Sequence, residues 1–207
     1  LRFVVGRQSC DTRALEGGRV DQGNPGYSGQ EALILINDVF VPDELIFMDG
    51  ETTFAAELVE RFTAYHRRSY VCKTGVGDVL IGAAALIADY DGVSGASHIR
   101  DKLVEMTHLN ETIYGAGIAS SHESKATPSG NFQNDDLLAN VCKHNVTRFP
   151  YEMARLAQDL AGGLLATLPS EADFNNDEIG DLLKRLLRGR EGASAEARAR
   201  VLRLIEH

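Results

Sequence analysis

The densest group of chemically reactive side chains lies between residues 64 and 78, where the sequence reads AYHRRSYVCKTGVGD. This stretch contains His66, Tyr70, Cys72 and Lys73 within eight residues. Imidazole and thiolate groups are the side chains that hold iron or zinc in proteins. The sequence therefore predicts His66 and Cys72 as candidate metal ligands, with Tyr70 and Lys73 as their polar neighbours.

The spacing of these two candidate ligands limits what they can bind. His66 and Cys72 are six residues apart, so the helix that carries them would need a break to bring both to one ion. Two ligands cannot close a four-coordinate site, so we expect further ligands from outside this chain. The alternative interpretation is that a single His and a single buried Cys near a helix end are packing residues.

The histidines further along the chain do not form a second candidate site. His98, His108 and His122 are spaced by ten and fourteen residues, so no pair has the i, i+4 spacing that places two ligands on one helix face. We interpret them as surface residues or as satisfied residues of a helical bundle.

The chain up to residue 50 is predicted to form strands and loops. The β-rich runs 31–36 and 39–41 are separated by Asn37 and Asp38, and Pro42 closes the second run. Two or three strands with this much loop do not make a stable sheet alone. We therefore expect residues 1–50 to be the remnant of a middle β domain that is incomplete in this chain.

From residue 51 onward the period of the apolar residues changes from two to about 3.6, which is typical of amphipathic helices. We expect a helix of about five turns after Gly50, and further helices at about 78–91, 97–124, 134–150 with a continuation to 162, 177–188 and 194–206. Asn110 and Gly117 fall on the apolar face of the helix at 97–124. The fold class is therefore mainly α, with a helical bundle over residues 51–207.

Helix-breaking residues separate these helices. The Gly130-Asn131 pair predicts a reversal of the chain, Pro150 predicts a kink or a restart, and Gly162-Gly163 predicts the end of a helix. Short turns of this kind between long helices are typical of an up-and-down bundle.

Charge and cysteine content restrict the partners and the compartment. Thirty acidic against 21 basic residues give a net charge of −9, so nucleic acid and anionic membranes are poor partners. Cys10, Cys72 and Cys142 do not form a secreted disulfide framework, which favours the cytoplasm. No apolar run approaches the roughly 18 residues that span a bilayer. The chain has no initiator Met and ends without a helix cap at His207, so we expect a piece of a longer protein.

Long runs of this sequence resemble the 4-hydroxybutyryl-CoA dehydratase family. The matching segments are residues 62–91, 96–112, 137–143, 147–152 and 168–174. The resemblance implies the carboxyl-terminal part of an enzyme with an acyl-CoA-dehydrogenase-like fold, in which a helical bundle follows a middle β domain. It also implies FAD and a 4Fe–4S cluster held by three Cys and one His, an acyl-CoA substrate, and a homotetramer built as a dimer of dimers.

The resemblance implies roles for particular residues. His66 matches the His ligand of the cluster, and Cys72 matches the one Cys ligand in this half, so the two remaining Cys ligands belong to the absent amino-terminal portion. Tyr70 and Lys73 match residues beside the substrate, and Glu31 matches a Glu that lines the same cavity. His66, Tyr70, Lys73 and Glu31 are therefore the catalytic candidates, whereas the other cysteines match no ligand.

The stretch at residues 158–163 resembles the region where acyl-CoA dehydrogenases contact the FAD of a neighbouring subunit. This resemblance makes Gln158, Gly162 and Gly163 candidate cofactor-binding residues. The alternative interpretation is a helix C-cap, because a Gly pair after a helix is commonly one.

Two departures separate this chain from the family. The family has a Gly-Gly pair between its Tyr and its Cys, where this chain has only Val71, a β-branched residue that restricts the backbone. The catalytic Glu in the family's final helices lies beyond His207. We therefore expect this chain alone to be inactive.

Three functions are compatible with these observations. The family's reaction dehydrates 4-hydroxybutyryl-CoA to crotonyl-CoA by a radical mechanism and carries vinylacetyl-CoA delta-isomerase activity. The second alternative is an FADH2-dependent monooxygenase of the 4-hydroxyphenylacetate 3-monooxygenase type. The third is a helical fragment that forms oligomers without catalysis. The adjacent Cys72 and Lys73 favour the first, because the monooxygenases do not need a thiolate ligand there.

Overall fold

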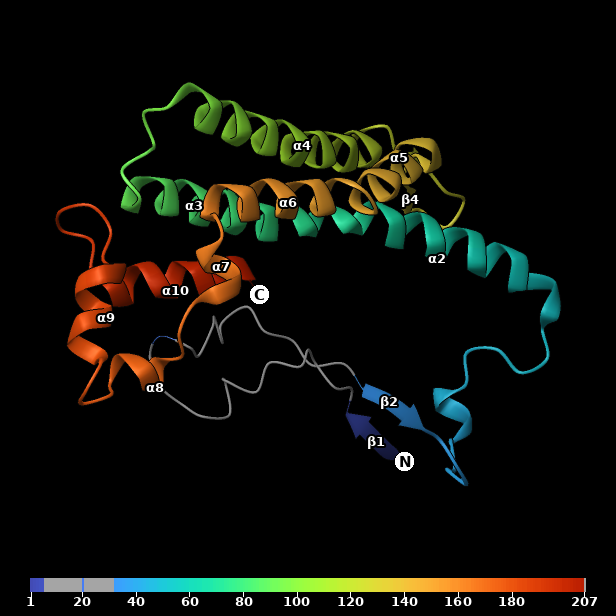
Figure 1. Ribbon diagram of the computed structural model, residues 1–207. Coiled ribbons are helices and arrows are strands. Elements are labelled where there is room, and N and C mark those ends of the chain that lie inside the picture. Colours follow the sequence, from blue (N-terminus) through green and yellow to red (C-terminus); the bar gives the residue numbers. More distant parts are fainter. Residues whose placement is uncertain (6–19, 21–31, 207) are drawn as a thin grey trace.

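The structure, a computed structural model, describes residues 1–5, 20 and 32–206 and is dominated by helices (Figure 1). The long helices are α2 (Ala55–Ser69), α3 (Lys73–Tyr90), α4 (Ser97–His122), α5 (Asp136–Val146) and α6 (Phe149–Ala161). Helix α4 packs against α3, α5 and α6, and α3 also packs against α6, so these helices form a bundle. The predicted fold class, mainly α with few strands before the bundle, is confirmed.

The first two long helices form one continuous helical path. The 3-10 helix η2 (Thr52–Phe54) leads into α2, and a second 3-10 turn, η3 (Tyr70–Cys72), joins α2 to α3. The prediction that the second helix starts near residue 78 is wrong, because α3 already begins at Lys73 and includes Gly75 and Gly77. Glycine inside a helix costs about 1 kcal/mol relative to alanine, but at Gly77 the missing side chain admits Asn110 of α4.

This helical path is also long and apolar. Within Thr52–Tyr90, an 18-residue window has a mean hydropathy of 1.6, enough to cross a membrane by length and composition. The prediction that no apolar run approaches this length is therefore wrong. In α3, however, Ala83, Ala84, Ile87 and Ala88 are buried against other helices of the bundle. Of the apolar window, 33% is buried inside the described structure, so α3 contributes one face to the bundle core.

The main hydrophobic core lies where α3, α4, α6 and the last helix, α10 (Ala195–Glu206), meet. Small residues of α3 allow the neighbouring helices to approach closely, and larger residues of the other helices fill the space. The buried members are Ala83, Ala84, Ile87, Ala88, Ile99, Met106, Leu156, Ala157, Leu160, Ala161, Val201, Leu202 and Ile205.

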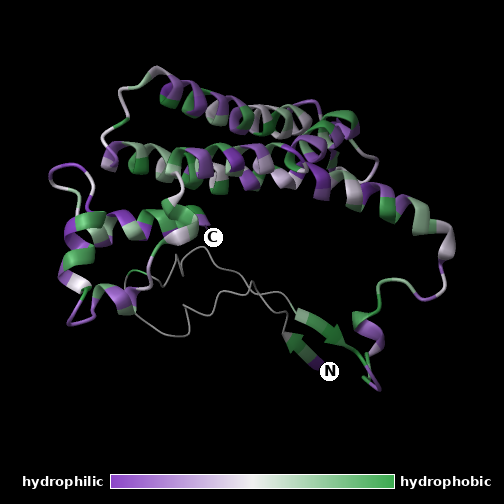
Figure 2. Cartoon of the chain, in the orientation of Figure 1, coloured by the Kyte–Doolittle hydropathy of each residue, from purple (hydrophilic) through white to green (hydrophobic). Residues whose placement is uncertain are grey.

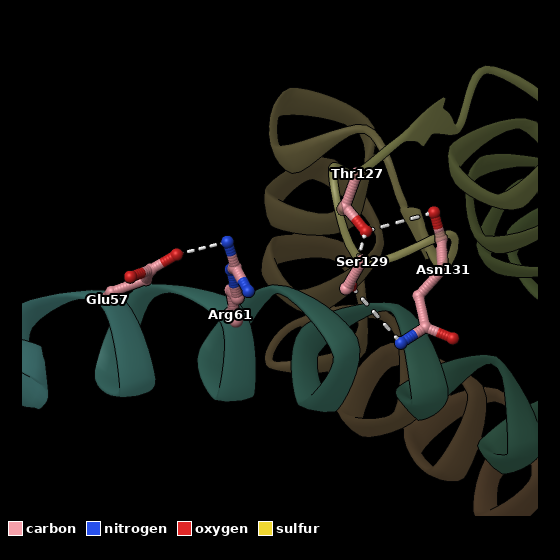
Figure 3. Close-up of polar contacts among 5 residues, drawn as sticks. All are labelled: Glu57, Arg61, Thr127, Ser129 and Asn131. Atoms are coloured by element: carbon pink, nitrogen blue, oxygen red, sulfur yellow. Dashed lines mark hydrogen bonds and ion pairs between the residues drawn. The ribbon is translucent and has the colours of Figure 1, made fainter.

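A small hairpin reverses the chain between α4 and α5, as the Gly130-Asn131 pair predicts. Its strands β3 (Lys125–Ala126) and β4 (Phe132–Gln133) pair antiparallel. Gly130 has a φ of +81°, a value that glycine adopts without steric cost. The Thr127 hydroxyl lies 3.1 Å from the Asn131 carbonyl oxygen and 2.9 Å from the Ser129 hydroxyl, which closes the loop (Figure 3).

The hairpin is held against α2. The Tyr65 hydroxyl on α2 donates a hydrogen bond to the carbonyl oxygen of Phe132 on β4. Two turns earlier on α2, Glu57 and Arg61 form an i, i+4 ion pair (Figure 3). Such an exposed pair contributes only about 0.3–0.5 kcal/mol, so the hairpin contact is the more specific constraint on this helix.

The amino-terminal strands lie apart from the helices (Figure 1). β1 (Arg2–Val5) pairs antiparallel with β2 (Ala32–Leu35), and Figure 2 shows that both are largely hydrophobic. The predicted strand at 39–41 is wrong, since these residues have no regular structure and are followed by the 3-10 helix η1 (Asp43–Leu45). Phe40 and Phe47 are 86% and 97% exposed. The assignment of residues 1–50 to a middle β domain stays a prediction.

The carboxyl-terminal part contains short helices around α10. They are α7 (Leu164–Thr167), α8 (Glu171–Phe174) and α9 (Gly180–Leu187). The sequence predicted α9 and α10, with looser bounds, but not α7 and α8. A capping box starts α8, in which the Ser170 hydroxyl and backbone amide both contact the Asp173 carboxylate at 3.0 Å.

Candidate functional site

A row of aromatic rings carries His66 on the surface of α2. The His66 ring stacks on Phe62, with 5.6 Å between ring centroids, and meets the Tyr70 ring edge-on at 4.9 Å. This row follows from the i, i+4 spacing of the three residues. Lys143 of α5 lies over the last ring of this row, with its ammonium 3.6 Å from the centroid of the Tyr70 ring. His66 is exposed and keeps its imidazole nitrogens available to a ligand.

The turn η3 changes the direction in which Cys72 points. In a continuous α-helix, six residues at about 100° each would place Cys72 about 120° away from His66 around the axis. A 3-10 turn rotates by about 120° per residue, so the three steps through η3 reduce this difference to about 60°. The helix break that the sequence predicted between His66 and Cys72 is therefore the 3-10 turn η3, which winds more tightly than an α-helix.

His66 and Cys72 together supply one imidazole and one thiol on adjoining faces of the same helix. Cys72 is exposed, and its sulfur is free. The axial rise between the two residues is about 10 Å. Among the residues that the structure describes, no three His, Cys, Asp or Glu side chains are grouped to hold a metal ion. The donor types fit iron, but further ligands must come from elsewhere.

A second cysteine lies behind this turn. Cys142 of α5 is fully buried, and its sulfur lies 3.9 Å from the Arg68 carbonyl oxygen and 3.8 Å from the Ile113 carbonyl oxygen. Burial raises the pKa of the Cys142 thiol above its ordinary value of 9.0, with Arg68 lowering it and Cys72 raising it to lesser degrees. Cys142 is therefore a packing residue in this structure.

Lys73 lies at a cavity of about 260 Å³ between α3, α4 and α6. The lining is mostly apolar, and its residues are Lys73, Val76, Gly77, Leu80, Asn110, Ile113, Val146, Pro150, Tyr151 and Met153. An apolar cavity with a cation and a phenol is suited to a small organic ligand that carries a polar group. The structure thus places Lys73 at this cavity, and Tyr70 in the aromatic row of α2.

Asn110 fixes one wall of this cavity. It is 2% exposed, and its side-chain amide donates hydrogen bonds to the Thr74 carbonyl oxygen at 3.1 Å and to Asp78 Oδ1 at 2.8 Å. A Cβ on Gly77 would lie 2.0 Å from Asn110 Oδ1, so a side chain at position 77 would have to displace the Asn110 amide. The sequence analysis did not assign a role to Asn110, although a polar residue at an apolar-spaced position is a signal of a buried hydrogen bond.

The remaining candidate residues lie elsewhere. Gly162 ends α6 with a φ of +73°, and its amide donates to the Gln158 carbonyl oxygen at 3.0 Å. This geometry is that of a helix C-cap, the alternative to cofactor binding that the sequence left open for these residues. Gly163 follows as the residue before α7. Eleven residues of helix separate Tyr151 from Gly162, a rise of about 16 Å. The structure therefore does not bring these residues to Lys73, while Glu31 and Cys10 lie outside the described residues.

The described helices form a bundle, and a small, mostly apolar cavity lies at Lys73, directly after the turn that carries Cys72. The family model described as "4-hydroxyphenylacetate 3-hydroxylase C terminal" matches residues 55–207. The chain belongs to this family.

Relatives narrow the assignment. The chain is 54% identical over 217 aligned residues to the 4-hydroxybutyryl-CoA dehydratase/vinylacetyl-CoA-Delta-isomerase of Clostridium aminobutyricum, covering 100% of this chain and 44% of that protein. It superposes on an oxygen-tolerant archaeal 4-hydroxybutyryl-CoA dehydratase from N. maritimus with a TM-score of 0.95 and 65% identity, covering 99% of this chain and 41% of that one. The predicted resemblance to 4-hydroxybutyryl-CoA dehydratases is confirmed. The chain spans less than half the length of these relatives.

Monooxygenases are more distant relatives. The oxygenase component of 4-hydroxyphenylacetate 3-monooxygenase from Geobacillus sp. is 25% identical over 77% of this chain and 33% of its own length. A structure of such an oxygenase component complexed with FAD superposes with a TM-score of 0.72 at 24% identity, over 86% of this chain and 38% of that one. The second likeness shows the fold alone.

Proposed function

We propose that this chain is part of a 4-hydroxybutyryl-CoA dehydratase, a lyase that forms crotonyl-CoA and water and also isomerises vinylacetyl-CoA. The observation that carries the proposal is that His66, Tyr70, Cys72 and Lys73 follow one another along one continuous helical path, with Lys73 lining an apolar cavity. The high identity to dehydratases over the whole chain supports it.

The proposed cofactors are FAD and a 4Fe–4S cluster. His66 and Cys72 would hold the cluster from this chain, and two cysteines outside it would complete the ligands. When bound, the flavin would supply one-electron chemistry and the cluster a Lewis acid for the substrate hydroxyl. Gln158, Gly162 and Gly163 would contact the flavin of a neighbouring subunit, a role that their exposed position at the end of α6 permits.

The residues of this chain would perform the proton and binding steps. Removing the hydroxyl from C4 and a proton from C3 of 4-hydroxybutyryl-CoA would give vinylacetyl-CoA and water, and moving a proton from C2 to C4 would then give crotonyl-CoA. The imidazole of His66 would accept the C3 proton only on a nitrogen that is not bound to iron, so His66 would have to leave the cluster to act as the base. The Lys73 ammonium, at the edge of an apolar cavity, would orient an acyl-CoA by its polar groups. Tyr70, held by Lys143, would donate its hydroxyl proton to the substrate.

The proposal includes assembly from several copies in the cytoplasm. Large apolar residues are exposed along α2, with Phe54, Leu58 and Phe62 at 57%, 56% and 64% exposure. Leu137 of α5 is 72% exposed. Contiguous apolar surface of this kind supports contact with other protein, and a homotetramer is the proposed state. Light scattering on the full protein tests it, and a monomer would contradict it.

The experiment uses the full protein, purified without oxygen, and measures flavin, iron and conversion of 4-hydroxybutyryl-CoA. We expect both cofactors and formation of crotonyl-CoA. Cys72→Ser and His66→Ala should lose iron and lower turnover by at least about 100-fold. His108→Ala, an exposed histidine on α4, is the matched control and should keep both. A protein that binds no iron, or a Cys72→Ser variant that keeps its iron, would disprove the proposal.

The monooxygenase is the second candidate, favoured by the description of the matching family model. Supplying the same preparation with reduced FAD, oxygen and 4-hydroxyphenylacetate distinguishes the monooxygenase from the dehydratase. Hydroxylation without iron, together with no action on the CoA ester, would select the monooxygenase.

A further inference from the structure

The turn η3 is pressed against α4 at a glycine. A Cβ on Gly117 would lie 2.6 Å from Cβ and 2.8 Å from Cγ2 of Val71, the middle residue of η3. The same atom would lie 3.5 Å from the sulfur of Cys142. Carbon atoms make favourable contacts at about 3.5–4.0 Å, so no side chain at position 117 is compatible with the observed position of the turn.

The contact cannot be relieved by rotating a side chain. Rotation about χ1 of Val71 moves Cγ2, but the position of Cβ is fixed by the backbone. An added methyl group at Gly117 therefore has to displace the backbone of η3 or of α4. The interior of a protein is close-packed, so such a displacement is transmitted to the neighbours.

Other contacts hold the turn on its remaining sides. The Thr74 hydroxyl donates to the Val71 carbonyl oxygen at 2.8 Å, and the Arg68 guanidinium donates to the Ser121 hydroxyl on α4 at 2.6 Å. Lys143 covers the ring of Tyr70, the first residue of the turn. These contacts therefore fix η3 in one position on α4, in direct contact with Gly117. We call this position the seating of η3.

We propose that Gly117 is a positioning residue. Because Gly117 has no side chain, η3 can pack against α4, and this packing sets the positions of Cys72 and Lys73. The seating is a property of the fold. Its consequence for iron binding by Cys72 rests on the function proposed above, so the two are tested by different measurements.

The glycines of the same helix supply matched variants. A Cβ on Gly115, two residues earlier on α4, meets no atom within 4 Å. Both Gly115→Ala and Gly117→Ala gain the same helix propensity, about 1 kcal/mol, so any difference between them reports the clash. Combining Gly117→Ala with Val71→Gly removes both clashing carbons, whereas Val71→Ala keeps the Cβ at 2.6 Å.

The first measurement is alkylation of Cys142 by iodoacetamide in the full protein without metal, resolved by mass spectrometry. Cys142 is buried behind the turn, so its rate reports whether the turn is seated. We expect Gly117→Ala to react about tenfold faster than the unmodified protein, through easier local opening. Gly115→Ala should be unchanged. The Val71→Gly double variant should recover protection, referenced to Val71→Gly alone, and the Val71→Ala double variant should not.

A destabilised control separates seating from general loss of stability. Leu160→Ala removes core side chain on α6, and it should lower the unfolding temperature while leaving Cys142 protected. The second measurement is iron bound after anaerobic reconstitution, where Gly117→Ala should retain several-fold less iron than Gly115→Ala.

Each outcome decides one of the two statements. If Cys142 is alkylated as slowly in Gly117→Ala as in Gly115→Ala, the proposed seating is wrong. It is also wrong if adding Val71→Gly to Gly117→Ala does not restore the slow alkylation of Cys142. If the seating holds and Gly117→Ala binds iron as the unmodified protein does, the positioning of Cys72 is wrong. If the unmodified protein binds no iron, the proposed cofactor fails, while the protection pattern still decides the seating.

Discussion

The side-chain amide of Asn110 lies 2.8 Å from Asp78 Oδ1 and donates a hydrogen bond to it. A second hydrogen bond from the same nitrogen reaches the Thr74 carbonyl oxygen. These bonds join α4 to the first turns of α3 at the wall of the cavity beside Lys73. A buried amide that connects two helices specifies how they align, because an unpaired polar group there would be costly.

Asn110→Ala should lower the free energy of unfolding by about 1–3 kcal/mol, because it leaves Asp78 and the Thr74 carbonyl without their donor. Denaturant unfolding of the full chain measures this change. Asn140→Ala on α5, an exposed position, is the control and should change stability by less than about 0.5 kcal/mol. Equal effects of the two variants would show that the Asn110 bonds contribute nothing.

Asn110→Asp adds a pH dependence to the same test. A carboxylate at position 110 would face the carboxylate of Asp78, and like charges at hydrogen-bond distance repel. The variant should therefore be less stable at neutral pH and should recover part of its stability as the pH falls, because taking up one proton removes the repulsion between the two carboxylates. A loss that is independent of pH would contradict this explanation.

Arg203→Ala should destabilise the carboxyl-terminal part. Arg203 is 5% exposed on α10, and its guanidinium donates to the Leu168 and Pro169 carbonyl oxygens at 3.2 Å and to Glu206 at 2.9 Å. Removing it leaves these partly buried carbonyl oxygens without this donor and breaks the ion pair with Glu206, at a cost of about 1–3 kcal/mol. Thermal unfolding should show the loss, whereas Arg200→Ala, exposed on the same helix, should unfold like the unmodified protein.

The ion pair between Arg198 and Asp91 should couple measurably in a double-mutant cycle. Arg198 Nε lies 2.6 Å from Asp91 Oδ1, and the two side chains are 19% and 18% exposed. We expect a coupling of about 1–2 kcal/mol, above the value for exposed pairs. The pair of Arg190 and Asp89, at 50% and 41% exposure, is the matched comparison and should couple by no more than about 0.5 kcal/mol. Equal couplings would mean that burial does not strengthen the first pair.

The sequence predicts the helices well because their apolar residues recur at helical spacing. It misplaces the start of α3 because Gly75 and Gly77 have low helix propensity, whereas the structure uses Gly77 for the close approach of Asn110. The run at 39–41 has strand propensity, but the described residues provide no neighbouring strand for it. Tertiary partners therefore overrode local propensity at both places.

The candidate site was predictable only where its residues are close in sequence. The contact of His66 with Tyr70 follows from i, i+4 spacing, and Lys73 lies one residue from Cys72. Lys143 meets the Tyr70 ring from another helix, a contact between positions 73 residues apart that no local pattern encodes. A role for Gly117 depends on the packing of α4 against η3, which spacing alone does not reveal.

The last prediction concerns the pH dependence of stability through Cys142. Burial raises the pKa of this thiol in the folded protein above the ordinary value of 9.0, so the folded state holds its proton at a pH where the unfolded state releases it. The stability that this group contributes is therefore fully present below the ordinary pKa of 9.0 and is lost as pH rises through the raised folded pKa. Denaturant unfolding between pH 7 and pH 10 should show a decline that is smaller in Cys142→Ala than in the unmodified protein. An identical decline in both proteins would show that Cys142 does not cause it.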